Sequence, residues 1–536
     1  MLLRLVLSTA GVVIGAQLLR YIYRLVHWHM FSPFRYMPGP PNPSLLYGNF
    51  GRVTFPTTQK WQAEYGPTFK FHNFLSVSSM SLYTIDTVAL HRIVNNSEIY
   101  QKAPMVRFNM TLMLGKGEPP DCSLLRTMST PNSEKSWSSP AFGPSQVHGL
   151  TQLFLDKSLE LSEFWAQQPQ DESGWAHLDV LAGLKAITLD IIGLAGFNYQ
   201  FNSLDTNKEP TELDEAFKKV FLQGGNRQPT PFTILRARFP ILLPLLPPPK
   251  RLTQGRGTMD RIGKQLLQDA KNAVASGEKL VERKDLLSLL VRSNMAKDIP
   301  ESHRLSDDVV VAQLPTFFVA GHETTSTATT WALYALALHP EVQATLRAEL
   351  QTMGTDSPSL DALNSLQYLD KVVREVMRIH SPVVFTNRMA MRDDVIPLGT
   401  PYTDTRGKQH DSIVVSKGQM IYVPVAALNR DTRIWGADAA EFKPDRWDAV
   451  PEAANSIPGV WSHLFSFLGG PHNCIGWRFS LAEMKCLLYT LIRTFEFELA
   501  VSPEELTVGR TAVQRPMLIS DPTKPQLPMR MRRVQV

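Results

Sequence analysis

One cysteine lies in a stretch whose residues and spacing suit a metal site. Cys474 follows Phe467 by seven positions, with Gly470 four residues before it and Gly476 two residues after it. Glycines let the backbone turn tightly and approach a flat group closely, and the N–H groups of such a loop can tune a sulfur. A helix predicted directly after the loop would favour the thiolate through its dipole. The stretch indicates a soft, anionic metal ligand.

The remaining cysteines do not extend this site into a cluster. Cys122 lies 352 positions before Cys474, Cys486 lies 12 positions after it, and no C-x-x-C pair occurs. A single thiolate suits haem iron better than zinc or an iron–sulfur cluster. The alternative is a structural cysteine buried in a glycine-rich turn.

The surroundings of Cys474 resemble the haem-binding signature of the cytochrome P-450 family, F-x-x-G-x-R-x-C-x-G. Phe467, Gly470, Cys474 and Gly476 occupy their places, and His472 stands where the family usually has arginine. In the family that arginine pairs with a haem propionate. A histidine can still donate a hydrogen bond but carries no permanent charge, so we expect a weaker propionate contact.

The sequence AGHETT at residues 320–325 resembles the oxygen-activation motif of the same family. The resemblance implies that Thr324 and Glu323 manage protons at the bound oxygen, because O–O cleavage needs two protons. Gly321 is expected to leave room for dioxygen. A threonine inside a helix can also bond the carbonyl one turn back.

Two further motifs resemble parts of the family that hold the haem loop. Glu375 and Arg378 match E-x-x-R, and their i, i+3 spacing places both charges on one helical face. The resemblance implies a buried triad completed by Arg446, and it implies that Arg388 pairs with a propionate. An ordinary exposed ion pair is the alternative reading of Glu375 and Arg378.

Residues 118–137 depart from the family pattern. A helix with W/H-x-x-x-R is expected before residue 140, but this segment has Pro119 and Pro120 in succession and no helical periodicity. A genuine divergent loop is one interpretation. The other is a reading-frame error, since a shifted frame can encode a helix-like string that contains H-x-x-x-R.

The elements that must position these residues are mostly helical. Apolar periodicity predicts a long helix over 309–339, with a kink at Pro315, and further helices over 361–380 and 480–494. Residues 68–84 and 414–425 favour small sheets. No alternation of strands and helices typical of a parallel sheet appears. The fold class expected is therefore mainly α with small β-sheets, the cytochrome P-450 fold, preceded by one N-terminal transmembrane helix.

The N-terminus divides into three parts. Residues 1–30 are apolar enough for a membrane anchor, residues 31–44 form a proline-rich elbow, and residues 45–536 form the haem-thiolate domain. A cleaved signal peptide is the alternative for the first part. The positive-inside rule predicts that the main body lies on the cytosolic side. The resemblance to microsomal members of the family implies a single-pass protein of the endoplasmic reticulum membrane. The apolar, proline-rich segment 239–251 could form a second membrane contact.

The expected function is that of a haem-thiolate monooxygenase that inserts one oxygen atom from O2 into a lipophilic substrate. Heme b is the implied cofactor, with electrons from NADPH through a separate flavoprotein reductase docked near Arg478 and Lys485. Apolar segments at 105–114, 317–320, 383–385 and 512–513 are candidates for the substrate pocket, and tailoring of a fungal secondary metabolite such as a terpenoid is the expected role.

Other function classes are either excluded or remain open. A net charge of only +5 and the lack of a Lys/Arg-rich run argue against a nucleic-acid partner. A haem-thiolate isomerase or dehydratase that uses no O2 stays possible. So does an inactive copy, on the strength of residues 118–137 alone.

Overall fold

The computed structural model describes residues 30–44, 47–73, 80–104, 106–107, 142–205, 211–217, 219–220, 250–275, 285–295, 306–509 and 513–534, with a few single positions elsewhere. Within these ranges the chain is mainly helical with small sheets, as predicted. The predicted anchor at residues 1–30 and the irregular segment 118–137 fall almost wholly outside them.

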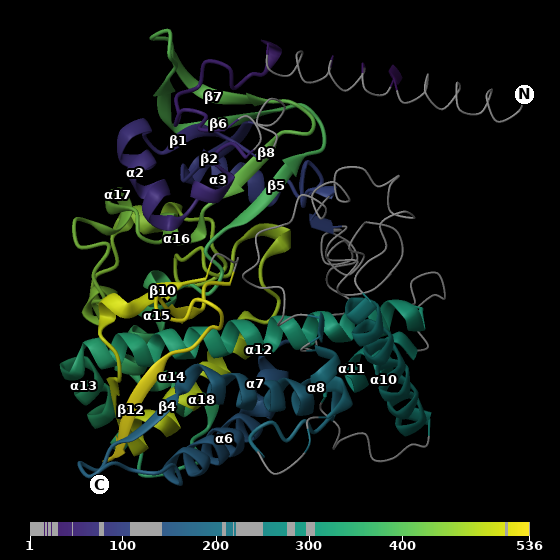
Figure 1. The fold of residues 1–536 in the computed structure, drawn as a ribbon, viewed down its shortest axis with the longest axis vertical. Coiled ribbons are helices and arrows are strands. Elements are labelled where there is room, and N and C mark those ends of the chain that lie inside the picture. The colour runs from purple at the N-terminus through teal and green to yellow at the C-terminus, as the bar shows by residue number, and fades with distance from the viewer. Residues whose placement is uncertain are drawn as a thin grey trace, which may run out of the picture.

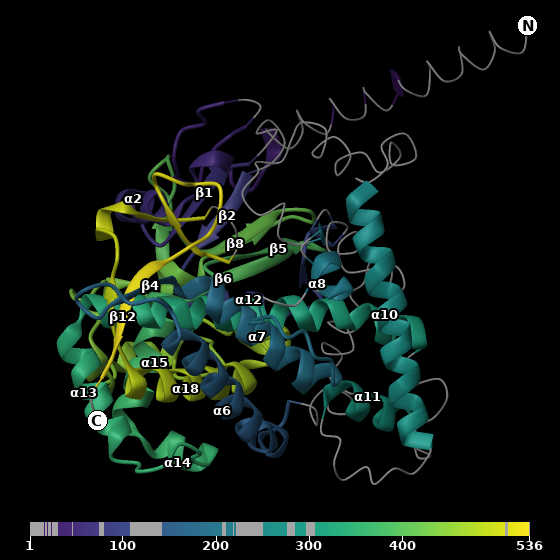
Figure 2. The same ribbon diagram turned by 60° about the horizontal axis from the view of Figure 1, so that its bottom comes forward.

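Four helices form the framework that carries the site. α12 (Asp307–Leu338) crosses the middle of the molecule, and α7 (Val180–Phe197) packs along it (Figure 1). α18 (Trp477–Thr494) contacts α12 from another side, and α6 (Pro144–Ala166) packs against both α7 and α18 (Figure 2). The most conspicuous motifs in the sequence therefore lie on or next to the central helices.

The long predicted helix is confirmed as α12. It begins two residues earlier than predicted, after Ser306, with Asp307 and Asp308 in the first turn, where acidic groups favour the helix dipole. The helix continues through Pro315. The predicted helix over 361–380 is two helices, α14 (Leu360–Ser365) and α15 (Gln367–Ile379), because Leu366 is extended.

Among the described residues, α7 is the one helix long and apolar enough to cross a membrane. It is an internal helix, and 78% of its residues are buried in the protein. Its apolar character is therefore explained by its place in the core, next to α12, and it gives no support to the predicted N-terminal span.

The largest sheet has five strands in the order β1-β2-β8-β5-β3. It confirms the predicted strands at 68–84, where Thr68 pairs with Thr84 in an antiparallel register. The smaller sheets are β4-β12-β9, β6-β7 and β10-β11. The strands are β1 (Thr68–His72), β2 (Met80–Thr84), β3 (Tyr100–Gln101), β4 (Ala176–Asp179), β5 (Thr386–Ala390), β6 (Asp394–Thr403), β7 (Gln409–Val415), β8 (Met420–Val423), β9 (Phe495–Leu499), β10 (Leu506–Val508), β11 (Pro516–Leu518) and β12 (Pro528–Arg533).

The other helices lie around this framework. They are α2 (Phe55–Tyr65), α3 (Thr87–Asn95), α8 (Glu212–Phe217), α10 (Lys250–Ala275), α11 (Leu286–Met295), α13 (Pro340–Gln351), α16 (Val425–Leu428) and α17 (Thr432–Trp435), with 3-10 turns η1 (Phe50–Arg52), η5 (Pro444–Asp448), η6 (Glu452–Ser456), η7 (Gly470–His472) and η8 (Pro503–Glu505). Residues 250–251 of the predicted irregular segment 239–251 are helical and begin α10; the rest of that segment lies outside the described residues.

The proline-rich elbow packs onto the largest sheet. Phe34 and Met37 are buried in the core, and the N–H of Lys70 on β1 donates to the carbonyl oxygen of Pro38. A Cβ at Gly39 would lie 2.0 Å from the carbonyl oxygen of Lys70, so glycine permits this close approach. The elbow is thus part of the packed molecule rather than a free linker.

Candidate active site

The Cys474 loop is a tight turn that depends on glycine. Gly470 has a φ of +66°, and a Cβ at this position would lie 2.4 Å from the carbonyl oxygen of Val94. The N–H of Cys474 donates to the carbonyl oxygen of Phe467 at 2.9 Å and closes the turn. The spacing of glycine, phenylalanine and cysteine in the sequence is therefore the spacing that this turn requires.

Cys474 is accessible although protein surrounds it. Its side chain is exposed, although it is surrounded by enough protein for burial to raise the pKa of the free thiol to about 11, against the opposing effect of the Gly476 N–H. Ala320 on the central helix α12 is exposed as well, and Thr324 is partly so. We interpret the exposure of Cys474 and Ala320 as a hollow between the Cys474 loop and α12.

Phe142 links the two walls of this hollow. It would lie 3.9 Å from a Cβ at Gly476, and its ring centroid is 5.7 Å from that of Phe317 on α12. The two walls are therefore held within the span of aromatic side chains.

Positive charge gathers at one edge of the loop. Arg388 is 3% exposed, and its guanidinium donates to the Thr386 hydroxyl at 2.9 Å and the Asn387 carbonyl oxygen at 3.0 Å. No carboxylate in the described part of the chain pairs with it, and burial lowers its pKa to about 10. Burial, together with the charges of Arg388 and Lys102, lowers the pKa of His472 to about 4. A buried guanidinium without a carboxylate is costly and fits an anionic group of a cofactor.

On α12 the Thr324 hydroxyl donates to the Ala320 carbonyl oxygen at 2.6 Å, the bond expected of a threonine inside a helix. Gly321 has a different role from the one expected. A Cβ at this position would lie 2.7 Å from the side chain of Ile192, so glycine allows α7 to pack closely on α12 rather than making room for dioxygen. The hydroxyl of Thr188 donates to the carbonyl oxygen of His322 at the same contact.

Glu323 lies between two cations from distant parts of the chain. Its carboxylate is 3.3 Å from Nζ of Lys185 on α7 and also pairs with Arg515, which precedes β11. Burial raises the pKa of Glu323, but the charges of Lys185 and Arg515 outweigh burial, so the pKa lies below its usual value. Glu323 is an ionised carboxylate beside Thr324.

A second buried acid, Glu483 on α18, was not identified from the sequence. It is fully buried, and among the described residues neither carboxylate oxygen has a hydrogen-bond partner. Burial raises its pKa well above the usual value, and the nearby Thr325 hydroxyl opposes this shift only in part. The sequence pattern could have predicted its burial, because Glu483 shares a helical face with the apolar residues Phe479 and Leu487, which are buried.

We expect Glu483→Gln to stabilise the protein at neutral and alkaline pH. Because the folded-state pKa of Glu483 is raised above the unfolded value, its contribution is fully present at low pH and is lost as pH rises through the folded pKa. Glutamine has no such loss. The thermal unfolding midpoint of the variant should exceed that of the wild type at neutral pH, and the difference should close toward a pH of ~4, where unfolded glutamates protonate.

The matched control is Glu349→Gln. The oxygens of Glu349 accept the N–H groups of Tyr368 and Leu369, each at 2.8 Å, so loss of its charge should lower the midpoint. A Glu483→Gln variant that is no more stable than the wild type at any pH would contradict the prediction.

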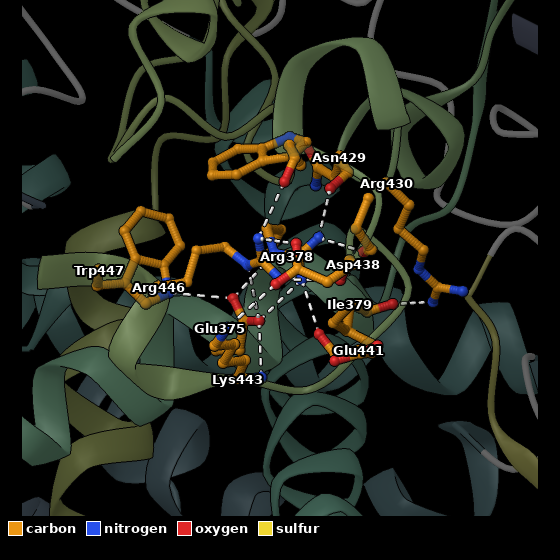
Figure 3. Close-up of polar contacts among 12 residues, drawn as sticks. Glu375, Arg378, Ile379, Asn429, Arg430, Asp438, Glu441, Lys443, Arg446 and Trp447 are labelled. Atoms are coloured by element: carbon orange, nitrogen blue, oxygen red, sulfur yellow. Dashed lines mark hydrogen bonds and ion pairs between the residues drawn. The ribbon is translucent and has the colours of Figure 1, made fainter. Parts of the chain in front are cut away.

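The structure brings Glu375, Arg378 and Arg446 together (Figure 3). Glu375 and Arg378 lie one turn apart on α15 and are fully buried. Two nitrogens of Arg378 donate to the two carboxylate oxygens of Glu375 at 2.8 Å each, and Nε of Arg446 lies 3.4 Å from the same carboxylate. The exposed-pair alternative for E-x-x-R is therefore wrong.

Further hydrogen bonds complete this cluster. Glu375 also accepts Nε1 of Trp447 at 3.1 Å and the N–H of Lys443 at 2.9 Å. Arg378 donates in addition to carbonyl oxygens of Asn429, Ala439 and Glu441 (Figure 3). Buried charges are tolerated when each is paired and hydrogen-bonded, and these are.

The structure does not support Lys485 as a docking residue. Lys485 is buried, with Nζ 2.9 Å from Asp370 and 3.0 Å from the Asn364 amide oxygen. The helical period of α18 turns it toward α14 and α15 instead of toward solvent. Arg478, the other candidate, is exposed and lies over the ring of Trp477.

The candidate pocket segments are only partly described. Phe317 and Phe318 are buried. Val383 pairs with Val513 in an isolated bridge, so the segments 383–385 and 512–513 lie side by side. Most of the segment 105–114 and residue 512 lie outside the described residues.

The comparisons with known proteins agree with this geometry. The family model for cytochrome P-450 matches residues 38–517. Cytochrome P-450 monooxygenase 205 of Postia placenta is 47% identical over 93% of this chain and 92% of its own length, and cytochrome P-450 monooxygenase 128 of the same fungus is 43% identical over 96% of each. A ganoderic acid synthetase of Ganoderma lucidum is 32% identical over 95% of this chain and 96% of its own. The chain belongs to the cytochrome P-450 family of monooxygenases.

Proposed function

We propose that the protein inserts one oxygen atom from O2 into a lipophilic substrate, by hydroxylation or epoxidation. The observation that supports this proposal is the exposure of the Cys474 side chain in its glycine-rich loop, together with that of Ala320 on α12, in a chain of the cytochrome P-450 family. Heme b would be held there by Cys474, with Arg388 and His472 toward its propionates; when bound, it supplies the binding and activation of O2.

The polar residues of α12 would supply protons within this apolar site. Thr324 can turn its hydroxyl from the carbonyl of Ala320 toward a guest in the hollow. Glu323 is ionised and can accept a proton, while Lys185 and Arg515 hold it in place. Thr324 and Glu323 are consecutive residues of α12, whose side chains diverge around the helix, so transfer of a proton between them would need water.

The substrate and pathway are proposed from chemistry and likeness. Phe317 and Val383 favour an apolar guest. The name of the Ganoderma relative refers to ganoderic acid, which supports a role in fungal secondary metabolism such as terpenoid tailoring. We also propose an endoplasmic reticulum membrane protein that takes electrons from NADPH through a separate flavoprotein reductase, with Arg478 on the docking face.

The direct test incubates the full chain with NADPH, a fungal reductase and isotopically labelled O2. Terpenoids, fatty acids and polycyclic aromatics are the substrate panel. The proposal expects a product that carries one labelled oxygen atom and forms only with NADPH. A product formed without O2 would instead indicate the isomerase or dehydratase class.

Thr324→Val should separate substrate oxidation from electron consumption. The substitution keeps the shape of the side chain and removes the hydroxyl, so NADPH oxidation continues while product falls about 100-fold, the low end of the effect of proton-transfer groups. The measurement is product formed per NADPH consumed.

Thr330→Val is the matched control, because the Thr330 hydroxyl makes the same i−4 bond, to the Ser326 carbonyl, but is buried. It should leave product per NADPH unchanged. Equal yields from Thr324→Val and the wild type would remove Thr324 from proton delivery.

A further inference from the structure

The buried ion cluster of Glu375, Arg378 and Arg446 makes no direct hydrogen bond to the Cys474 loop among the described residues. The guanidinium of Arg378 reaches the carbonyl oxygens of Asn429, Ala439 and Glu441, and none of these lies in the loop. The loop itself is closed by the bond from the Cys474 N–H to the Phe467 carbonyl oxygen. The connection must therefore reach the residues just before Phe467.

Asn429 makes that connection. It follows α16, is fully buried, and accepts Nη1 of Arg378 on its backbone carbonyl oxygen at 3.2 Å (Figure 3). Its side chain reaches the other way: Oδ1 accepts the N–H of Phe465 and Nδ2 donates to Oγ of Ser466, both at 2.8 Å. One residue thus touches both the ion cluster and the chain that leads into Phe467.

Ser466 closes the network back onto α15. Its hydroxyl donates to the carbonyl oxygen of Met377 at 2.6 Å, next to Arg378. A serine hydroxyl has one proton, so toward Asn429 it can only accept. The amide nitrogen of Asn429 must therefore face Ser466, and its oxygen must face the N–H of Phe465.

This network needs an amide. Aspartate could accept from Phe465, but it could not donate to Ser466 and would place a buried charge beside an oxygen that only accepts. Alanine would leave the N–H of Phe465 without a partner. Because the site uses one acceptor and one donor on a short side chain, asparagine fits it and close relatives of asparagine do not.

We propose that Asn429 is a positioning residue for the metal ligand: its amide fixes residues 465–467 against α15, and the bond from Phe467 to the Cys474 N–H transmits that position to the sulfur. The proposal rests on the proposed haem-thiolate function, since it concerns the ligand that this function assigns. It adds a role for a residue that touches neither the hollow nor a substrate.

The test compares Asn429→Ala and Asn429→Asp with Asn49→Ala in the full chain. Asn49 is a matched control, because it is also buried and also joins two segments, donating to the Pro41 carbonyl oxygen and accepting the His72 N–H. Both alanine variants should lower the thermal unfolding midpoint. Two quantities are measured on reduced, carbon-monoxide-bound protein: the fraction with the red-shifted Soret band of thiolate ligation, and its rate of loss well below the midpoint.

The Asn429 variants should lose the thiolate band about tenfold faster than the wild type, which corresponds to about 1.4 kcal/mol, and Asn49→Ala should keep the wild-type rate. Equal rates for all the proteins, or equal acceleration by Asn49→Ala, would overturn the positioning role. If Asn429→Ala does not fold, Ser466→Ala gives the same readout, because it removes the acceptor of Nδ2. A wild-type protein without a thiolate band would refute the proposed function itself, which is a different result.

Discussion

Replacing Arg378 with alanine is expected to remove a large share of the stability of the fold. The substitution leaves the carboxylate of Glu375 buried without its bidentate partner and leaves three backbone carbonyl oxygens without a donor. Breaking a buried pair in this way costs about 3–5 kcal/mol, whereas whole proteins are stable by only about 5–15 kcal/mol. The measurement is the free energy of unfolding in denaturant, or the yield of folded protein where none survives purification.

Two variants make this result specific. Arg378→Lys keeps the charge but not the planar fork, so its loss of stability should be smaller yet clear. Lys219→Ala removes an exposed pair with Glu215 and should cost less than about 1 kcal/mol. If Arg378→Ala unfolds at the same denaturant concentration as the wild type, the cluster does not hold the fold as described.

Replacing Cys474 with serine is expected to abolish oxygenation while the polypeptide still folds. The change removes the sulfur from the hollow but keeps the N–H that donates to the carbonyl oxygen of Phe467. A serine hydroxyl is a poor ligand for haem iron compared with a thiolate. Product should be undetectable, and the reduced, carbon-monoxide-bound protein should lack the thiolate band.

Cys486→Ser is the matched control for this experiment. Cys486 is a buried cysteine on α18, and burial raises the pKa of its thiol, so it is an inert side chain. Its serine variant should keep both the thiolate band and the activity. A wild-type spectrum from Cys474→Ser would show that another residue holds the metal.

Local sequence patterns predicted the parts of the site that are local in the chain. The apolar period gave α12 within two residues at its start, and the i, i+3 spacing of Glu375 and Arg378 placed both on one face of α15. The glycine spacing around Cys474 anticipated the tight turn. In each case the interaction lies within one element or one loop, where period and spacing are sufficient.

The resemblance to the family predicted one tertiary contact, that of Arg446 with Glu375, but others were missed. Arg515 pairs with Glu323 although it lies 192 positions further along the chain. Local residue spacing cannot predict a contact over that separation. The sequence analysis expects Gly321 to leave room for dioxygen. In the structure the side chain of Ile192 occupies that space, because α7 packs closely on α12 there. Lys485 is predicted to lie on a basic docking face near Cys474, but it is buried and pairs with Asp370.

Residues 118–137 bear on the function without being part of the described structure. The two interpretations, a divergent loop and a reading-frame error, predict different proteins: only the shifted frame encodes H-x-x-x-R before residue 140. Transcript reads across these codons decide between them. An in-frame transcript that matches the printed sequence would contradict the reading-frame hypothesis.

The central claim is that Cys474 of this chain, as printed, holds haem iron as a thiolate. The measurement that tests it most directly is the carbon-monoxide difference spectrum of the dithionite-reduced full chain in microsomes, with the protein quantified on a blot. The account predicts the red-shifted Soret band of thiolate ligation, absent from Cys474→Ser and present in Cys486→Ser. Abundant, cooperatively folded protein with no such band would contradict it.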